Sequence, residues 1–205
     1  MAMLTPVQLP FNKIINQSKD GHSITSDSAF LVETITKQVL GQNNDVLELG
    51  SGNGIVSIML SHYHPNWKIL GIEIQNHLVI LSNDNVRLSE TSPSFMEADL
   101  RKFTSSRKYD IIISNPPYFP NKKGRISPIE ERAISRHEIT CNMMDILECV
   151  KRNLKEKGNA FILYPQNRED DLVNFAKKVD LKVMKKFVLD SEKNKSKIIV
   201  ELVHA

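Results

Sequence analysis

Three short stretches carry backbone and side chains that could bind a ligand and act on it. Residues 48–54 read Glu-Leu-Gly-Ser-Gly-Asn-Gly and join an apolar run to a helical pattern. Glycines at such a junction let the backbone pass close to a ligand, and the helix N-terminus presents free N–H groups. Glu73 and Asp99 close the next two apolar runs, and Asn-Pro-Pro-Tyr at 115–118 follows a fourth. These residue types predict a nucleotide-type site beside a rigid turn.

The glycine stretch fits S-adenosylmethionine better than a dinucleotide. Its spacing is GxGxG and not the GxGxxG of the dinucleotide fingerprint. A pyrophosphate would be repelled by Glu48, whereas a sulfonium and an ammonium group would not. Glu73 could accept hydrogen bonds from both ribose hydroxyls and Asp99 from the adenine amino group, although solvated loop acids are the alternative. The predicted cofactor-binding residues are Glu48, Gly50, Ser51, Gly52, Gly54, Glu73, Ile74, Asp99, Leu100 and Asn115.

The Asn-Pro-Pro-Tyr stretch suits transfer of a methyl group to a planar nitrogen. Two prolines stiffen the backbone and remove two N–H donors. An exocyclic amine on a base is a poor nucleophile, because its lone pair is delocalised into the ring. Asn115 Oδ1 and the Pro116 carbonyl could accept hydrogen bonds from its two N–H groups, and the Tyr118 ring could stack on the base. The alternative is a rigid turn with a structural asparagine. The predicted catalytic residues are Asn115, Pro116 and Tyr118.

Strands that alternate with helices must place these stretches at one edge of a sheet. Apolar runs predict strands over 46–50, 68–74, 94–99, 109–114, 159–165, 182–189 and 197–203. Helical patterns cover 27–40, 54–63, 75–90, 143–157 and 168–179. This order predicts an α/β, Rossmann-like, doubly wound sheet of seven mostly parallel strands, with helices on both faces. The last two strands lack an intervening helix and are expected to form an antiparallel hairpin at the sheet's edge.

Length and composition describe one ordinary soluble domain. The chain has 205 residues, of which 40% are hydrophobic and 25% charged, and no apolar run approaches a membrane span. We expect a single domain over 1–205, with an N-terminal segment and helix over 1–44. The long loop at 119–136 is either a lid or a surface insertion. Two cysteines without a CxxC exclude a cysteine-built zinc site, so we expect no metal and a cytoplasmic location.

Basic residues suggest an anionic partner without requiring one, since the net charge is only +3. Eight lysines fall within 177–197, opposed there by three acids. Either they form an ordinary charged surface or they contact nucleic-acid phosphates. The oligomeric state is not fixed by the sequence, and a monomer is favoured. The predicted substrate-binding residues are Pro117, Lys122, Lys123 and Arg136.

Taken in order, the stretch 48–54, Glu73, Asp99 and the stretch 115–118 resemble class I S-adenosylmethionine-dependent methyltransferases of the Asn-Pro-Pro-Tyr group. Three further segments narrow this resemblance to the bacterial tRNA adenine N6-methyltransferase family, which modifies the adenine next to the anticodon of a valine tRNA. These segments are 21–31, 135–140 and 195–203. The resemblance implies methyl transfer to adenine N6 in tRNA, with S-adenosylhomocysteine as the product.

The resemblance has departures and leaves other acceptors open. Ser-Ile-Thr-Ser precedes Asp27, and Ala-Phe-Leu at 29–31 stands where that family has two adjacent aliphatic residues. A protein glutamine N5-methyltransferase acting on release factor poses the same chemical problem, since a primary amide nitrogen is also planar. A ribosomal RNA guanine N2-methyltransferase is a further acceptor choice. A non-catalytic relative that binds RNA or the cofactor is disfavoured by the intact acids and Asn-Pro-Pro-Tyr.

Overall fold

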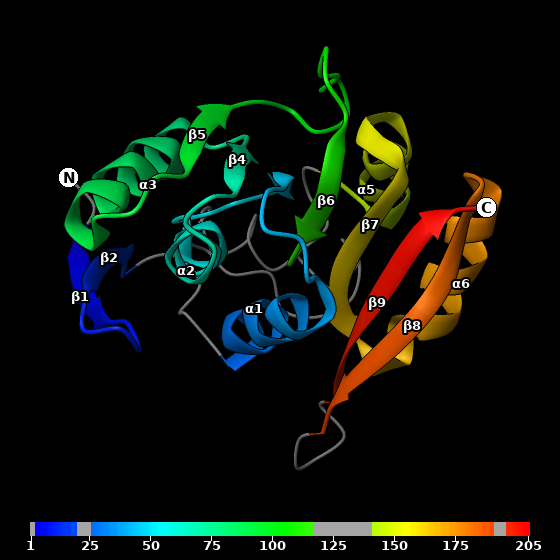
Figure 1. Cartoon of the computed structure of the whole chain (residues 1–205), viewed down its shortest axis with the longest axis horizontal. Helices are drawn as coiled ribbons and strands as arrows, with labels where there is room; N and C mark the ends of the chain where they lie inside the picture. The colour runs from blue at the N-terminus through cyan, green and yellow to red at the C-terminus, as the bar shows by residue number, and fades with distance from the viewer. Residues whose placement is uncertain (1–2, 20–25, 117–140, 191–195) are drawn as a thin grey trace.

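A computed structural model describes residues 3–19, 26–116, 141–190 and 196–205. These residues form a seven-stranded sheet in the order β5-β4-β3-β6-β7-β9-β8, and a separate two-stranded sheet of β1 and β2 (Figure 1). The strands of the large sheet are β3 (Asp45–Leu49), β4 (Lys68–Glu73), β5 (Ser94–Glu97), β6 (Tyr109–Ser114), β7 (Leu154–Pro165), β8 (Leu181–Leu189) and β9 (Lys197–His204). The predicted seven-stranded α/β sheet is thereby confirmed.

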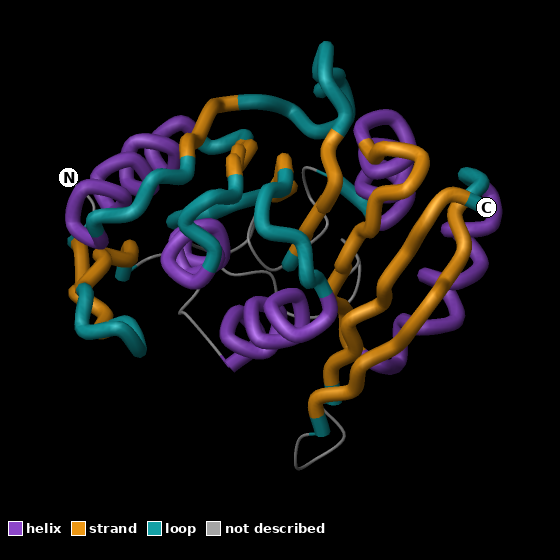
Figure 2. The backbone as a smooth tube through the Cα atoms, viewed as in Figure 1, coloured by secondary structure: helices purple, strands orange, loops and turns teal. Residues whose placement is uncertain are grey.

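The C-terminal hairpin is also confirmed, with one refinement. β9 pairs antiparallel with both β7 and β8, and it lies between them in the sheet. β8 therefore runs in the same direction as β7, so within the described sheet β9 alone opposes the other strands. β8 is the last strand on one side of the sheet, at the right in Figure 2, and β5 is the last strand on the other side.

Helices cover both faces of the sheet. On one face α1 (Ser26–Gln38), α2 (Ile55–Tyr63) and α3 (Asn76–Ser89) pack over a core that includes Ile111 and Ile113. On the other face α5 (Met143–Asn153) and α6 (Glu169–Lys178), preceded by the short 3-10 helix η1 (Gln166–Arg168), pack over Ile112. The three consecutive isoleucines of β6 thus fill both cores, as expected for a strand buried on two sides. None of the helices in the described ranges combines the length and apolarity that a bilayer span requires.

The predicted helix over 143–157 is wrong in its last turn. The helix ends at Asn153, and Leu154 already has extended backbone angles (φ −77°, ψ 139°). Leu154 pairs with Tyr109 of β6 and is 2% exposed. Its spacing from Val150 matches a helix, but strand pairing with Tyr109 determines its conformation. Tertiary pairing overrides local periodicity here.

An N-terminal hairpin was not predicted. β1 (Leu4–Gln8) and β2 (Ile14–Ser18) pair antiparallel and lie beside α3 (Figure 1). Pro6 inside β1 argues against a strand, because proline cannot donate to a ladder. It is tolerated because β1 pairs only with β2, so one side of β1 has no partner strand.

A buried acid joins β3 to α2. Glu48 is 3% exposed, and its Oε2 accepts hydrogen bonds from the Ser57 backbone N–H at 3.2 Å and from the Ser57 hydroxyl. Burial raises the pKa of Glu48 to about 8, against the lowering effect of the two Ser57 hydrogen bonds. The carboxyl group is therefore mainly protonated at pH 7, unlike the charged Glu48 assumed from the sequence.

This raised pKa predicts a pH-dependent stability. The folded state keeps the Glu48 proton at pH values where the unfolded chain, with a pKa near 4.5, has lost it. The contribution of Glu48 to the free energy of unfolding should therefore fall as the pH rises from 4.5 to about 8, by at most about 1.4 kcal/mol per pH unit. Glu48→Gln removes this titration and keeps an acceptor for Ser57.

Urea unfolding at several pH values between 5 and 8 measures the effect. The stability of Glu48→Gln relative to wild type should increase with pH across this range. Glu148→Gln, at an exposed position of α5, should give a constant difference. A Glu48→Gln difference that does not change with pH would show that the carboxyl group titrates normally.

Candidate cofactor and methyl-transfer site

The ends of three neighbouring strands bring the predicted site residues to one edge of the sheet. Leu49 of β3 is in register with Ile72 of β4 on one side and with Ser114 of β6 on the other. The next residue of each strand therefore lies at the same edge. These residues are Gly50, Glu73 and Asn115. Open α/β sheets bind ligands at this carboxyl edge.

The glycine loop has a backbone course that requires its glycines. Gly50, Gly52 and Gly54 have φ angles of 70°, 55° and 84°, in the left-handed region that other residues rarely adopt. The loop starts with two hydrogen bonds from the N–H groups of Gly50 and Ser51 to the Ile72 carbonyl, at 2.9 and 3.1 Å. The backbone thus turns sharply over the end of β4 before α2 begins.

Space and unused polarity around the loop fit a bound cofactor. A Cβ atom built on Gly50 or Gly52 meets nothing within 4 Å, so the loop borders open space at both residues. Ser51 Oγ is buried and has no hydrogen-bond partner within the described part of the chain. Behind the loop, a Cβ on Gly71 would lie 2.5 Å from the Phe95 ring, so β4 admits that ring only because residue 71 is glycine. The loop is therefore supported from behind and open in front.

Glu73 is tied to the loop and held in one orientation. Its Oε2 accepts the Gly52 N–H at 3.0 Å, and its Oε1 accepts the Gln75 N–H at 3.0 Å. The residue is 7% exposed. A carboxylate oxygen can accept more than one hydrogen bond, so Glu73 retains acceptor capacity for hydroxyl groups at this edge. Ile74, the next residue, is half-buried.

Asp99 was expected to be a free acceptor, but its carboxylate already binds the guanidinium group of Arg101. Its carboxylate accepts two hydrogen bonds from Arg101 Nε, at 2.9 and 3.1 Å, and one from Arg101 Nη2, at 2.7 Å. These bonds from Arg101 lower the pKa of Asp99. An adenine amino group would share this carboxylate with the guanidinium. Leu100 is half-buried beside it, and its carbonyl accepts a hydrogen bond from Arg152 at 2.9 Å.

Asn115 and Pro116 follow β6 directly. Ser114 Oγ donates to the Leu49 carbonyl at 2.9 Å and so fastens the end of β6 to the start of the glycine loop. Asn115 is half-buried and Pro116 is buried. The other predicted residues on this side lie outside the described residues, as does the 119–136 loop: Pro117, Tyr118, Lys122, Lys123 and Arg136.

Helix α3 supplies loop contacts that were not predicted. Ser82 Oγ donates to the Gly52 carbonyl at 2.8 Å, and Asn85 Nδ2 donates to the Asn53 carbonyl at 3.0 Å. Both side chains are fully buried. The signal was present, because Ser82, Asn85 and Ser89 stand at positions i, i+3 and i+7 and mark a polar stripe on one helix face.

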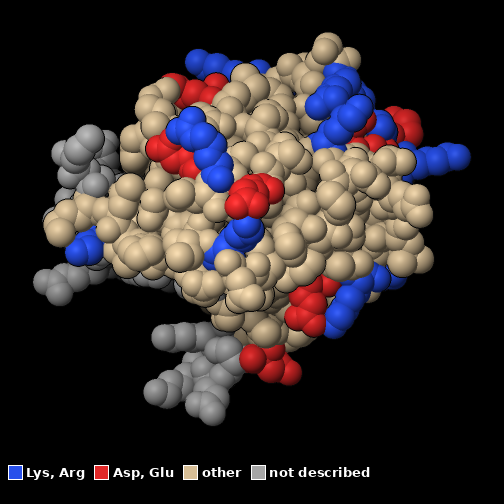
Figure 3. All heavy atoms as spheres, turned by 60° about the vertical axis from the view of Figure 1, so that its left-hand side comes forward, with Lys and Arg blue, Asp and Glu red and all other residues tan. Residues whose placement is uncertain are grey.

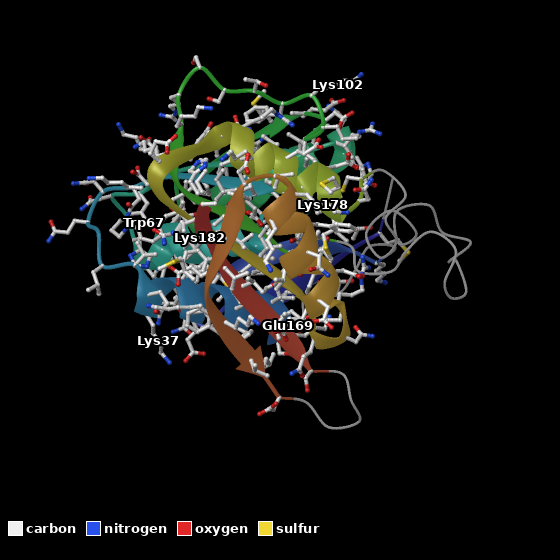
Figure 4. All side chains as sticks on the ribbon, turned by 90° about the vertical axis from the view of Figure 1, so that its right-hand side faces the viewer. Lys37, Trp67, Lys102, Glu169, Lys178 and Lys182 are labelled. Atoms are coloured by element: carbon white, nitrogen blue, oxygen red, sulfur yellow. The ribbon has the colours of Figure 1, made fainter. Side chains whose placement is uncertain are left out.

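Five of the eight lysines within 177–197 lie on α6 and β8, Lys197 lies in β9, and Lys193 and Lys195 fall outside the described residues. Figure 4 shows Lys178 on α6 and Lys182 at the start of β8. Lys186 forms an ion pair with Glu169, and Lys185 Nζ donates to Gln38 Oε1 at 3.0 Å. On another face of the molecule, Figure 3 shows basic and acidic side chains intermingled. In the portions described, no group of three His, Cys, Asp or Glu side chains is arranged to hold a metal ion.

Comparison with known proteins places this geometry in a family. Residues 21–164 match the methyltransferase small domain family. A tRNA1(Val) (adenine(37)-N6)-methyltransferase of Dyadobacter fermentans is 27% identical over 155 residues, which are 73% of this chain and 62% of that relative. The chain thus spans less than two thirds of the length of this relative. A ribosomal protein uL3 glutamine methyltransferase of Xanthomonas campestris is 34% identical over 85 residues, 41% of this chain and 28% of that protein.

Solved structures agree on the fold. A methyltransferase from Pyrococcus furiosus superposes with a TM-score of 0.69 at 16% identity, over 94% of this chain and 89% of that one. The family match covers most of the chain, including the glycine loop and the end of β6. The chain therefore belongs to the methyltransferase small domain family, and its cofactor is S-adenosylmethionine.

Proposed function

We propose that this protein transfers a methyl group from S-adenosylmethionine to N6 of an adenine in tRNA. The acceptor proposed is the adenine at position 37 of a valine tRNA, the nucleotide named for its relatives. One observation carries the proposal: Asn115 and Pro116 follow β6 at the edge where β3 turns into the glycine loop, with Ser114 bonded to Leu49 at 2.9 Å. An amine-holding turn and a cofactor loop are thus adjacent.

The proposed cofactor contacts divide between the loop and the next two strands. The methionine end of the cofactor lies against the glycine loop, and the Ser51 hydroxyl is its proposed polar contact there, because the N–H groups of Gly50, Ser51, Gly52 and Gly54 already donate to protein acceptors. Glu73 accepts from the ribose hydroxyls. Asp99 accepts from the adenine amino group, and the ring lies between Ile74 and Leu100. Glu48 lies behind the loop, as a neutral group that a cationic ligand would help to ionise.

Asn115 and Pro116 act by holding the acceptor nitrogen. S-adenosylmethionine supplies an electrophilic methyl group on a positively charged sulfur. Asn115 Oδ1 and the Pro116 carbonyl accept hydrogen bonds from the two N–H groups of the adenine amine and so orient its lone pair. Tyr118 stacks on the adenine, which leaves its neighbours at the lowest free-energy cost in an RNA loop. No strong base is needed, since the extra proton leaves after transfer.

Lysines on α6 and β8 are proposed to contact tRNA phosphates. β8 lies three strands from β6 in the sheet, a separation of about 14 Å. A nucleic acid can bridge that distance, and such contacts weaken as salt is added. Pro117, Lys122, Lys123 and Arg136 are proposed to line the acceptor side.

A protein glutamine methyltransferase is the second candidate. It is favoured by the 34% identity to the uL3 glutamine methyltransferase, which is higher than the identity to the tRNA enzyme but covers a shorter segment. The amide nitrogen of glutamine would be held by the same two acceptors.

An acceptor assay separates the two candidates. In separate reactions, the protein and labelled S-adenosylmethionine are incubated with one acceptor preparation each. The preparations are total tRNA, ribosomal RNA, release factor and ribosomal proteins. We expect label in tRNA, recovered as N6-methyladenosine after nuclease digestion. If a protein glutamine is labelled and tRNA is not, the acceptor is a protein amide and the proposed tRNA acceptor is wrong.

Gly52→Ala tests the cofactor loop. The added methyl group meets no protein atom within 4 Å, so it projects into the space proposed for the cofactor. The affinity for S-adenosylhomocysteine, measured by calorimetry, should fall about tenfold or more. Asp180→Ala is the matched control, because residue 180 also has a left-handed φ (54°) but lies between α6 and β8. Equal affinity in Gly52→Ala and wild type would show that the cofactor does not bind against this loop.

Asn115 variants test the acceptor-holding role. Asn115→Ala should lower kcat by about 100-fold, since one hydrogen-bond partner of the reacting nitrogen is lost. Asn115→Asp keeps an acceptor oxygen and should retain more of kcat than Asn115→Ala. Single-turnover transfer rates at saturating S-adenosylmethionine and tRNA measure both. Rates for Asn115→Ala that match wild type would exclude the role.

A further inference from the structure

A single buried side chain links the N-terminal hairpin to the glycine loop. Asn85 of α3 is fully buried. Its Oδ1 accepts the Asn16 N–H at 2.8 Å, and its Nδ2 donates to the Asn16 carbonyl at 2.9 Å and to the Asn53 carbonyl at 3.0 Å. Asn16 belongs to β2 and Asn53 to the loop, so one side-chain amide forms hydrogen bonds with two segments that are far apart in sequence.

The loop is already constrained on its other atoms. Ser82 holds the Gly52 carbonyl at 2.8 Å, and Glu73 holds the Gly52 N–H at 3.0 Å. The Asn53 carbonyl depends on Asn85 instead. The orientation of the Asn85 amide therefore bears on the path of the loop between Gly52 and Gly54.

The orientation of Asn85 depends in turn on the hairpin. Asn16 lies opposite Pro6 of β1 in a non-hydrogen-bonded pair, so its main-chain N–H and C=O point away from β1. Both main-chain groups of Asn16 face α3, where Asn85 binds them like a partner strand. Leu9 and Ile15, at 3% and 0% exposure, anchor the hairpin in the core under α1 and α2.

We propose that Asn85 is a positioning residue that couples the seating of the N-terminal hairpin to the affinity of the glycine loop for S-adenosylmethionine. The proposal rests on the proposed cofactor site and goes beyond the methyl-transfer role. When the hairpin is seated, the buried amide has all its partners and holds the Asn53 carbonyl. When the hairpin leaves, Asn85 loses two of its three hydrogen bonds and the loop loses a fixed point. By linkage, cofactor binding must stabilise the seated hairpin equally.

Asn16→Pro breaks the coupling at one atom. It removes the N–H that Asn85 Oδ1 accepts, and this N–H takes no part in the pairing of β2 with β1. Asn16→Ala is the matched control, because both hydrogen bonds involve main-chain atoms and survive it. The dissociation constant for S-adenosylhomocysteine should rise about fivefold in Asn16→Pro and stay unchanged in Asn16→Ala. Equal affinity in all three proteins would overturn the proposal.

Hydrogen exchange provides a second readout that needs no catalysis. Saturating S-adenosylhomocysteine should slow exchange of the amides of residues 14–18 in wild type and in Asn16→Ala. In Asn85→Ala at saturation this protection should be lost. If wild type shows no protection of these amides on binding, the coupling does not exist, even if Asn16→Pro fails to fold. Loss of binding in Gly52→Ala with full binding in Asn16→Pro would keep the cofactor site and reject the coupling.

Discussion

The hydrogen bond from the Gly52 N–H to the Glu73 carboxylate is the contact on which the rest of the site depends. It joins the turn after β3 to the end of β4, at 3.0 Å, where the register of the two strands has already brought these residues side by side. The left-handed angle at Gly52 turns its N–H toward the acid. The side chains of α3 then fix the carbonyl side of the same loop. The side chains of Glu73, Ser82 and Asn85 therefore hold the loop backbone on both its N–H side and its carbonyl side.

Much of this architecture was predictable because the responsible signals are local. The apolar runs and the intervening helical patterns gave the seven strands and the covering helices. The glycines at 50, 52 and 54 indicated a loop of unusual backbone geometry, and their positive φ angles agree with it. Glu73 and Asn115 could be placed at one edge because parallel strands share the location of their carboxyl ends. The contacts of these residues with cofactor and acceptor remain predictions.

The remaining features arise from contacts between distant segments, which local patterns do not encode. The helix expected to continue through Leu154 ends at Asn153, because Leu154 joins β6 in the sheet. Glu48 was treated as a charged group, but its pKa reflects a burial that only the packed layers of β3 and α2 create. The N-terminal hairpin was missed because Pro6 breaks the strand pattern. The role of Asn85 depends on two carbonyls and one N–H brought together by three separate segments.

The position of β9 between β7 and β8 affects how the chain can fold during synthesis. β8 leaves the ribosome before β9, yet it reaches the sheet only by pairing with β9. Until residues 197–204 emerge, the 181–189 segment has no strand to join and the open edge of β7 is exposed. The nascent chain thus carries two unpaired strand edges that could associate with other chains. Completion of the sheet is therefore a late event, because the strand that joins β8 to β7 is synthesised after both of them.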